Sequence, residues 1–296
     1  DILVNKLHIP AHDIIFDVNV LSVGTGIEEH ARYGIDFIEA VRWIKQNLPG
    51  SYTSGGISNL SFAFRGNNTV REAMHSIFLY HGVKAGLDMG IVNPGMLQVY
   101  DDIEPDLLKK AEDVILDRDP EATERLITKA QEIMAAKEAE KAAAAGGAAP
   151  MKSEPAKVSV NAEDRVKEAL VKGKSVGLEA DIMECYHKYG TAVKVIEGPL
   201  MAGMERVGEL FGAGKMFLPQ VVKSAKIMKD AVSILEPYMT GEGGDSTDRP
   251  VIVNATVKGD VHDIGKNITG IVLSCNGFNV IDLGVMVDKE TILDEA

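Results

Sequence analysis

Residues 251–285 read VIVNATVKGDVHDIGKNITGIVLSCNGFNVIDLGV, and this stretch decides the fold of the C-terminal part of the chain. The apolar run VIVNATV is followed by the polar loop KGDVHDIGKN, the helical pattern ITGIVLSCNG and a second apolar run, NVIDLGV. This order predicts two parallel strands joined by a crossover helix. We therefore expect residues 251–296 to begin a doubly wound α/β domain that continues beyond Ala296.

The polar loop of this unit carries Asp260, His262 and Gly265 in the pattern D-x-H-x-x-G. It follows the carboxyl end of a strand, where open α/β sheets bind their ligands. A metal-binding histidine usually has its second ring nitrogen held by a carboxylate, and Asp260 is close enough in sequence to supply one. A glycine at position 265 would let a bulky ligand approach the backbone. An isolated D-x-H pair is more often a surface turn, so this interpretation depends on the rest of the chain.

Two nucleotide-binding interpretations fail. Five residues separate Gly259 from Gly265, whereas a phosphate-binding loop has four at that place, and Asn267 replaces the Ser or Thr that would bind magnesium. The run Gly24-Thr25-Gly26 lacks the third glycine of the dinucleotide fingerprint.

The N-terminal part of the chain repeats a unit of short apolar strand, polar loop and amphipathic helix. The predicted strands end near Asp17, Asn59 and Asn93, and helices are predicted over residues 28–48 and 68–86. Polar side chains at the carboxyl ends of strands are typical of the active sites of (β/α) barrels. About three units fit here, and a closed barrel needs about 250 residues. We therefore expect residues 1–134 to be the C-terminal part of a (β/α)8 barrel that begins upstream of Asp1.

Residues 161–239 show helical periodicity and no convincing strand, which predicts a four-helix bundle. Asn161 followed by Asp164 resembles a capping box. Further helices are expected over residues 178–189, 192–210 and 219–238, and linkers over 135–160 and 240–250. The predicted fold class is therefore multidomain, α/β plus α.

The bulk composition excludes several classes of function. With 296 residues, 45% of them hydrophobic, the chain suits two or three globular domains. A net charge of −13 disfavours nucleic acid as a partner. No apolar run reaches the ~18 residues of a membrane span, and no leader pattern is present, so we expect a cytoplasmic protein. Cys185 and Cys275 form no C-x-x-C pattern, which argues against a disulfide framework or a structural zinc site.

Several stretches resemble one known family. The run DVHDIGKN, residues 260–267, resembles the cobalamin-binding signature of methionine synthases, corrinoid proteins and mutases. FDVNVLSVGTGIEEH and SGGISNLSFAFRGN are similar to the pterin-binding barrel of cobalamin-dependent methionine synthase, and GKMFLPQVVKSAKIMK to its helical cap. The resemblance covers nearly the whole chain, whereas mutases share only the D-x-H-x-x-G signature. It implies a pterin-binding barrel, a cap bundle and a Rossmann-like or flavodoxin-like cobalamin-binding domain.

This resemblance implies a methyltransferase of methionine biosynthesis. The methyl group would pass from 5-methyltetrahydrofolate, through protein-bound cobalamin as methylcobalamin, to homocysteine. Homocysteine, and the zinc of the family, would be bound by a domain absent from this chain, so the fragment alone is expected to be incomplete for turnover. Two alternatives stay open: a non-catalytic cobalamin-binding carrier or sensor, and a folate-site methyltransferase with an unrelated α/β neighbour.

The resemblance also implies roles for individual residues at the cofactor. His262 would bind the cobalt of cobalamin, and Asp260 would be its hydrogen-bonding partner, so these two form the expected catalytic pair. Further cofactor contacts would come from Gly259, Val261, Asp263 and Gly265 in the loop and from Glu197, Phe211 and Leu218 in the cap.

Four residues of the barrel would bind the folate: Asp17, Asn59, Arg65 and Arg71, the first two near the reacting N5 of the pterin. Methyl transfer from an amine nitrogen requires activation of that nitrogen by a proton, which suits acidic and amide groups around the ring. Asn93 has no implied role.

In the bundle, Met201, Met204 and Met216 are interpreted as plain core, because methionines at helical spacing usually pack inside. Phe211 is different, because it precedes Gly212 and Gly214, where the helix is expected to end, and it should project from the bundle.

Overall fold

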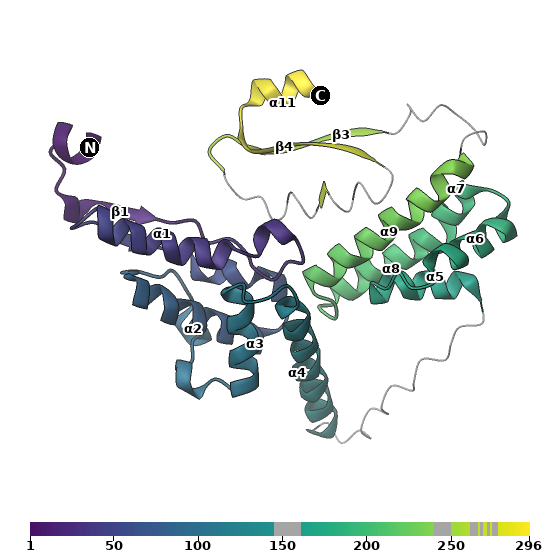
Figure 1. Ribbon diagram of the computed structural model, residues 1–296, viewed down its shortest axis with the longest axis horizontal. Coiled ribbons are helices and arrows are strands. Elements are labelled where there is room, and N and C mark those ends of the chain that lie inside the picture. The colour runs from purple at the N-terminus through teal and green to yellow at the C-terminus, as the bar shows by residue number, and fades with distance from the viewer. Residues whose placement is uncertain (145–160, 240–249, 261–265, 267–268, 271–272, 274–277) are drawn as a thin grey trace. The chain divides into compact units, whose positions relative to one another are not determined.

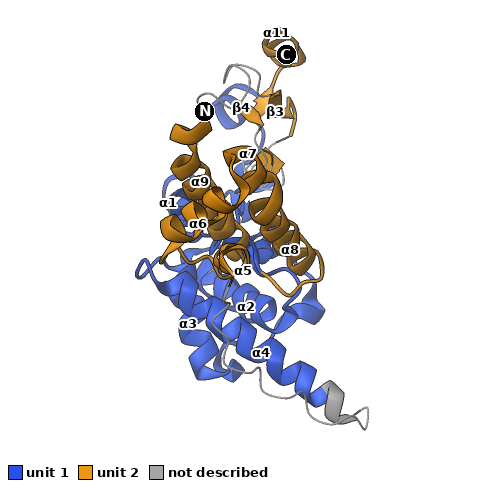
Figure 2. Ribbon diagram, turned by 90° about the vertical axis from the view of Figure 1, so that its right-hand side faces the viewer, with its two compact units in different colours: residues 1–152, 217–219 blue, residues 153–216, 220–296 orange. Residues whose placement is uncertain are grey.

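The computed structural model describes residues 1–144, 161–239, 250–260, 266, 269–270, 273 and 278–296, with the backbone alone for 141–144. The chain divides into two compact units, residues 1–152 with 217–219, and residues 153–216 with 220–296 (Figure 2). Within the described residues, none of the helices combines the length and the apolar character that a membrane crossing requires.

The first unit contains a short parallel sheet. Strand β1 (Ile15–Asp17) pairs in parallel with β2 (Tyr52–Ser54), and Asp17 lies opposite Ser54. The segment that was predicted as a third strand joins this sheet at one isolated bridge, between Ile91 and Gly56. It extends no further because Asn93 caps the 3-10 helix η5 (Pro94–Met96), which leads the chain away.

Position 59 does not follow a strand directly, which corrects the sequence prediction. Strand β2 stops at Ser54, two glycines follow, and Asn59 lies in the 3-10 helix η4 (Ile57–Phe64). The chain needs glycine at position 55, because a Cβ atom there would lie 2.7 Å from the ring of Phe37.

Helices α1 (Tyr33–Asn47) and α2 (Asn68–Ala85) follow the two strands, as predicted (Figure 1). Helix α1 begins later than expected because the short 3-10 helix η3 (Glu28–His30) comes before it. The Oδ1 atom of Asn67 accepts the N–H of Val70 at 3.3 Å and so caps α2. Gly86 ends α2 with φ +109°, a backbone conformation that favours glycine. The buried face of α2 has helical spacing: Val70, Ala73, Met74, Ile77 and Phe78.

Two further helices complete the described part of the first unit, α3 (Pro105–Ile115) and α4 (Ala122–Ala144). The carboxylate of Glu104 caps α3 by accepting the N–H groups of Asp106 and Leu107 at 3.1 and 2.9 Å. Helix α4 covers the first ten positions of the predicted linker 135–160, and residues 145–160 lie outside the described part of the chain.

The second unit contains a helical bundle made of α5 (Ala162–Lys172), α6 (Leu178–Tyr189), α7 (Ala192–Val195), α8 (Met201–Gly212) and α9 (Leu218–Met239) (Figure 1). Asn161 caps α5 by accepting the N–H of Glu163 at 3.2 Å. The residues predicted as one helix over 192–210 divide into α7, the π-helix η7 (Ile196–Leu200) and α8. Pro199 lies within η7 and has no N–H to donate, which accounts for the irregular turn. Fully buried residues of the core include Val166, Leu170, Ile182, Leu200 and Leu235.

The C-terminal segment forms a separate strand pair. Strand β3 (Val251–Val257) pairs in parallel with β4 (Asn279–Val287), as the sequence predicts, and α11 (Lys289–Glu295) follows. The register shifts between Asn254 and Ala255 and between Ala255 and Val257. These irregularities lie at the carboxyl end of β3, just before the D-x-H-x-x-G loop.

Candidate functional site

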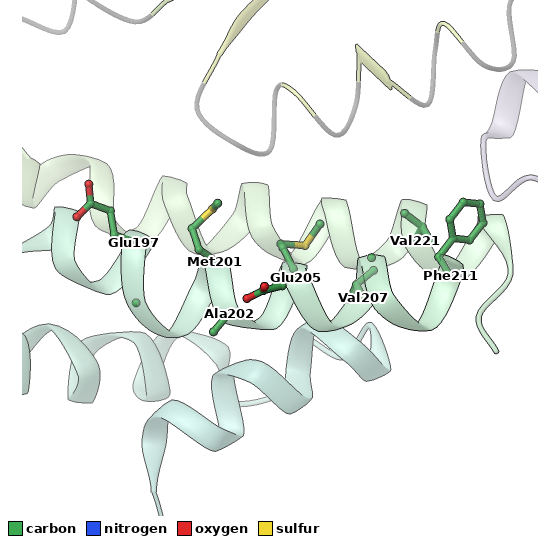
Figure 3. Close-up of a pocket in the computed structure, with 10 residues that line it drawn as sticks. Glu197, Met201, Ala202, Glu205, Val207, Phe211 and Val221 are labelled. Carbon is green, nitrogen blue, oxygen red and sulfur yellow. The ribbon is translucent and has the colours of Figure 1, made fainter. Parts of the chain in front are cut away.

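A pocket of about 540 Å³ lies on the helical bundle, along η7, α8 and the first turn of α9 (Figure 3). Its lining is mostly apolar, with a carboxylate at Glu197 and another at Glu205. Glu197 lies at one end of the row of lining side chains and Phe211 lies at the other (Figure 3). The other lining residues are Gly198, Met201, Ala202, Met204, Val207, Gly208 and Val221.

The helical repeat explains why these residues share one surface. Positions 197, 201, 204, 208 and 211 are three or four residues apart, so they lie along one face of the continuous η7–α8 segment. Two of the lining residues are glycines. A Cβ atom at Gly208 would meet nothing within 4 Å, and at Gly198 the nearest atom would be 3.8 Å away. No side chain projects from the surface at these two positions, so the surface suits a broad, flat and largely apolar ligand.

The three predicted cap residues are not equivalent in the structure. Glu197 and Phe211 both line the pocket, and Phe211 is 37% exposed at the end of α8, as its place before Gly212 and Gly214 predicts. Leu218 is buried at the start of α9, is grouped with the first unit, and is not part of the lining.

Sequence reasoning missed two of the methionines at this surface. Met204 and Met216 are buried in the core, as predicted, and Met201 packs against it. Met201 and Met204 nevertheless also line the pocket. Their spacing with Glu197 and Phe211 could have indicated this, because all four lie on one helical face.

The base of the D-x-H-x-x-G loop is described as far as Asp260. Gly259 adopts φ +95° and donates its N–H to the Sδ atom of Met286 at 3.3 Å. The Asp260 backbone is held on both sides, since its N–H donates to the Val257 carbonyl at 3.0 Å and its carbonyl accepts the N–H of Met286 at 3.3 Å. The loop therefore starts from a fixed point at the end of the sheet. Val261, His262, Asp263 and Gly265 lie outside the described residues.

The far side of the loop is also attached to the sheet. The ammonium of Lys266 donates to both carboxylate oxygens of Asp282, on β4, at 2.6 Å, and its side chain is only 7% exposed. Burial tends to raise the pKa of Asp282, but the hydrogen bonds from Lys266 and from the Gly284 N–H outweigh it and hold the pKa below its usual value. Asn254 on β3 donates to the Lys266 carbonyl at 2.9 Å. Both strands thus fix the residue that follows the loop.

The predicted folate residues lie around the carboxyl ends of the strands in the first unit. Asp17 ends β1 with an exposed side chain, and Asn59 and Arg65 are exposed on and just after η4. Arg71 is half-buried on the first turn of α2, where its Nε donates to the Ser61 hydroxyl at 3.0 Å. Asn93 has a local role, because its Oδ1 accepts the N–H of Gly95 at 3.0 Å.

A smaller pocket of about 180 Å³ lies directly after β1. Its lining includes Asn19, Asp36 and Tyr33. Asn19 follows Asp17 by two residues, whereas Tyr33 and Asp36 come from the first turn of α1 and were not predicted as site residues from the sequence.

Two protein families match separate parts of the chain. Residues 2–93 match the family described as pterin binding enzyme, and residues 162–236 match the family described as B12 binding domain. The chain carries a pterin-binding and a B12-binding domain. The expectation of a pterin-binding and a cobalamin-binding domain is confirmed for these two ranges of residues. The B12-binding match covers the helical bundle, including every residue of the 540 Å³ pocket.

Three similar solved structures carry cobalamin or corrinoid in their names. A novel cobalamin-binding protein from Desulfitobacterium hafniense DCB-2 is 28% identical, with a TM-score of 0.38 over 46% of this chain. The monomethylamine corrinoid protein of Methanosarcina barkeri is 30% identical, with a TM-score of 0.30 over 45%. The methanol:cobalamin methyltransferase complex MtaBC from the same organism is 29% identical, with a TM-score of 0.35 over 48%. The chain spans 63%, 62% and 58% of these three structures, respectively, which is less than two thirds of their length.

The surface of the B12-binding domain fits a corrinoid. The lining is apolar along its length, and the small residues Gly198, Ala202 and Gly208 leave room for the face of a flat macrocycle. The same lining offers no basic side chain, so it is unsuited to a phosphate. Among the described residues there is also no cluster of three or more His, Cys, Asp or Glu side chains that would hold a metal ion by itself.

Proposed function

We propose that this chain is a central part of a cobalamin-dependent methionine synthase, which transfers a methyl group from 5-methyltetrahydrofolate through cobalamin to homocysteine. The observation that carries this proposal is the presence of a pterin-binding and a B12-binding domain in one chain. A carrier or sensor of cobalamin would have no use for a pterin site. Bound cobalamin would supply a cobalt centre that can accept and donate a methyl group.

In this proposal the residues of the first unit bind and activate the folate. The Asp17 carboxylate at the end of β1 and the Asn59 amide on η4, both exposed, would hydrogen-bond the pterin ring near N5. Arg65 and Arg71 would hold the rest of the substrate. A nitrogen that loses a methyl group leaves more easily when it is protonated, so groups that stabilise the protonated ring promote the transfer.

In the second unit, Glu197, Phe211 and the small residues between them would cover one face of the cofactor. His262 would bind the cobalt, and Asp260 would hold the proton on its second ring nitrogen. Gly259, Val261, Asp263 and Gly265 would form the rest of the loop against the corrin. Leu218 would contribute to the cap only if the start of α9 reaches the cofactor, since it is buried and outside the pocket.

The proposal is tested with the full-length protein that contains this chain. Protein loaded with cobalamin is incubated with 5-methyltetrahydrofolate labelled on its methyl carbon, and homocysteine is offered as the acceptor. Formation of labelled methionine supports the proposal. Loss of the folate methyl group only when a different acceptor is supplied would indicate another corrinoid methyltransferase, and binding of cobalamin without any methyl transfer would favour a carrier or sensor.

Asn59→Ala is expected to lower the rate of methyl transfer from folate about 10- to 100-fold, because it removes one hydrogen bond that strengthens as the ring becomes charged. Cobalamin binding should not change, because Asn59 lies outside the B12-binding domain. Single-turnover kinetics with bound cobalamin measure the rate. Asn93→Ala is the matched control, since that side chain only caps a local turn. Equal rates for the two variants would remove Asn59 from the mechanism.

Phe211→Ala is expected to weaken cobalamin binding about 10-fold while leaving the bundle folded. The Phe211 side chain lines the pocket and is partly exposed. Its removal therefore takes away more contact area with the ligand than contact area within the core. Titration followed by visible absorbance measures the dissociation constant, and thermal unfolding of the free protein measures stability. Val193→Ala, at an apolar position of α7 that is 40% exposed and outside the lining, is the control. A large loss of stability with unchanged affinity would show that Phe211 is a core residue.

A further inference from the structure

A buried serine in the first unit connects two side chains of α2. The Oγ atom of Ser61, on η4, lies 2.7 Å from Nε2 of His75 and accepts the Nε–H of Arg71 at 3.0 Å. Ser61 and His75 are both 0% exposed, whereas Arg71 reaches the surface. The three side chains therefore form a chain of hydrogen bonds that runs from the core to a guanidinium group.

His75 is neutral and lies at the buried end of this chain. Burial and the nearby Arg71 charge lower its pKa to about 4, and the backbone at Ser58 and Met96 opposes them only partly. Polar backbone at Ser58 and Met96 interacts with the ring, but among the described residues Nδ1 makes no hydrogen bond of good distance and angle. A buried polar atom without a partner costs stability, and an apolar side chain would fill this place at lower cost. Packing alone therefore does not explain a histidine here.

The hydrogen atoms of this network can be assigned consistently around Ser61. Arginine has no acceptor, so the Nε–H of Arg71 must donate to the Ser61 oxygen. The hydroxyl proton of Ser61 then donates either to His75 Nε2 or to the Ser58 carbonyl, 3.3 Å away. In both cases a lone pair of the hydroxyl stays directed at Arg71, and the rigid core position of His75 limits where that hydroxyl can lie.

The guanidinium that this network holds has no carboxylate partner in the described part of the chain, and neither has that of Arg65, although the protein carries a net charge of −13. Arg65 directly follows η4 and Arg71 lies on the first turn of α2, and burial together with the charge of Arg65 lowers the pKa of Arg71. Two guanidinium groups at this end of α2 without an internal counterion match an external anion, in particular a carboxylate, which a guanidinium can bind through paired N–H donors.

We infer that Ser61 and His75 are positioning residues that hold Arg71, beside Arg65, for a carboxylate of the glutamate tail of the folate substrate. The inference rests on the proposed function, because it requires a folate in this unit. The pterin ring is neutral and offers both donors and acceptors, which suits Asp17 and Asn59. The tail is anionic, and guanidinium groups only donate.

The test compares three probes with the full-length protein: 5-methyltetrahydrofolate, the same reduced pterin without its glutamate, and inorganic phosphate as a competitor. Ser61→Ala removes the acceptor for Arg71, and it should raise the dissociation constant of 5-methyltetrahydrofolate about 10-fold while changing that of the truncated pterin less than about two-fold. Ser76→Ala is the matched control and should change neither constant, because Ser76 is a buried serine of α2 that contacts Glu72 and Gln98 and not Arg71.

A double-mutant cycle with Arg71→Lys shows whether Ser61 acts through Arg71. Lysine keeps the charge but loses the Nε–H, so Arg71→Lys should weaken folate binding by a similar factor, and adding Ser61→Ala should change it little further. If Ser61→Ala folds poorly, Arg71→Lys still tests the inference by itself with the same probes, because it changes a partly exposed side chain and removes the N–H that Ser61 accepts. His75→Gln, which keeps a hydrogen-bonding group near Ser61, should retain most of the affinity.

Several results would overturn the inference. If Ser61→Ala weakens the binding of 5-methyltetrahydrofolate and of the truncated pterin equally, Arg71 contacts the pterin ring and not the tail. If the effects of Ser61→Ala and Arg71→Lys are additive, Ser61 does not act through Arg71. Competition by millimolar phosphate that Ser61→Ala does not alter would indicate a general anion site unrelated to the tail. If the unmodified protein binds no 5-methyltetrahydrofolate, the proposed function itself fails, and this outcome is distinct from normal binding that Ser61→Ala leaves unchanged.

Discussion

Acidification from pH 7 to pH 5 is expected to reduce the free energy of unfolding of the first unit by about 2 kcal/mol through His75 alone, and by about 3 kcal/mol at pH 4. The pKa of His75 falls from its ordinary value of 6.5 to about 4 in the folded protein, because the ring is buried next to Arg71. Between pH 6.5 and about pH 4 the unfolded chain binds a proton at His75 and the folded protein does not. The contribution is therefore fully present above pH 6.5 and is lost as the pH falls toward 4.

The chain offers a direct probe and a matched control for this effect. Trp43 is the single tryptophan and lies on α1, so its fluorescence during denaturant unfolding reports on the first unit. His75→Gln keeps a hydrogen-bonding side chain near Ser61 but does not titrate, so the variant should lose less stability than the unmodified protein between pH 7 and pH 5. Carboxylates titrate equally in both proteins. Parallel stability curves for the two proteins would show that His75 takes up its proton normally in the folded state.

His262→Gly is expected to abolish the nitrogen ligand of bound cobalamin and to reduce turnover by more than the roughly 10- to 100-fold that removal of an outer-shell partner costs. The measurement is the electron spin resonance spectrum of the protein with cobalamin in its cobalt(II) state, in which an axial nitrogen splits the signal. Asp260→Asn should retain the splitting and lose less activity, because an amide oxygen can still accept the ring proton. Persistence of the splitting in His262→Gly would remove His262 from the cobalt and with it a main part of the proposed function.

Asp282→Asn separates the role of the loop from that of its histidine. Lys266 is nearly buried against the Asp282 carboxylate, so the amide variant leaves the ammonium with a weaker partner and loosens the far end of the loop. The nitrogen splitting should then remain, but with a broader distribution of geometries than in the unmodified protein. A broader signal would show that the attachment of the loop to the strand pair helps to hold the histidine ligand. A signal as sharp as that of the unmodified protein would show that the loop sequence alone is sufficient.

The sequence by itself determined the local structure well where a pattern depends on neighbours in the chain. The bounds of α2 and α6 could be predicted because Asn67 and Gly86 cap the first and Gly190 ends the second, and caps act over a few residues. The parallel pairing of β3 with β4 followed from the order of strand, loop, helix and strand. The exposure of Phe211 followed from the glycines after it.

Only the tertiary structure decided which of these residues meet. The helical repeat places Glu197 and Phe211 on one face, but only the structure shows that this face is left open as a pocket and is not covered by another part of the bundle. The contact of Ser61 with His75 joins residues fourteen positions apart on two different elements, and no periodicity of either element predicts it. Burial also changes the chemistry, since the same histidine has its ordinary pKa in a solvated chain and a pKa of about 4 inside this core. Sequence patterns specify elements through short-range interactions, whereas partners and pKa values depend on the three-dimensional packing that surrounds each group.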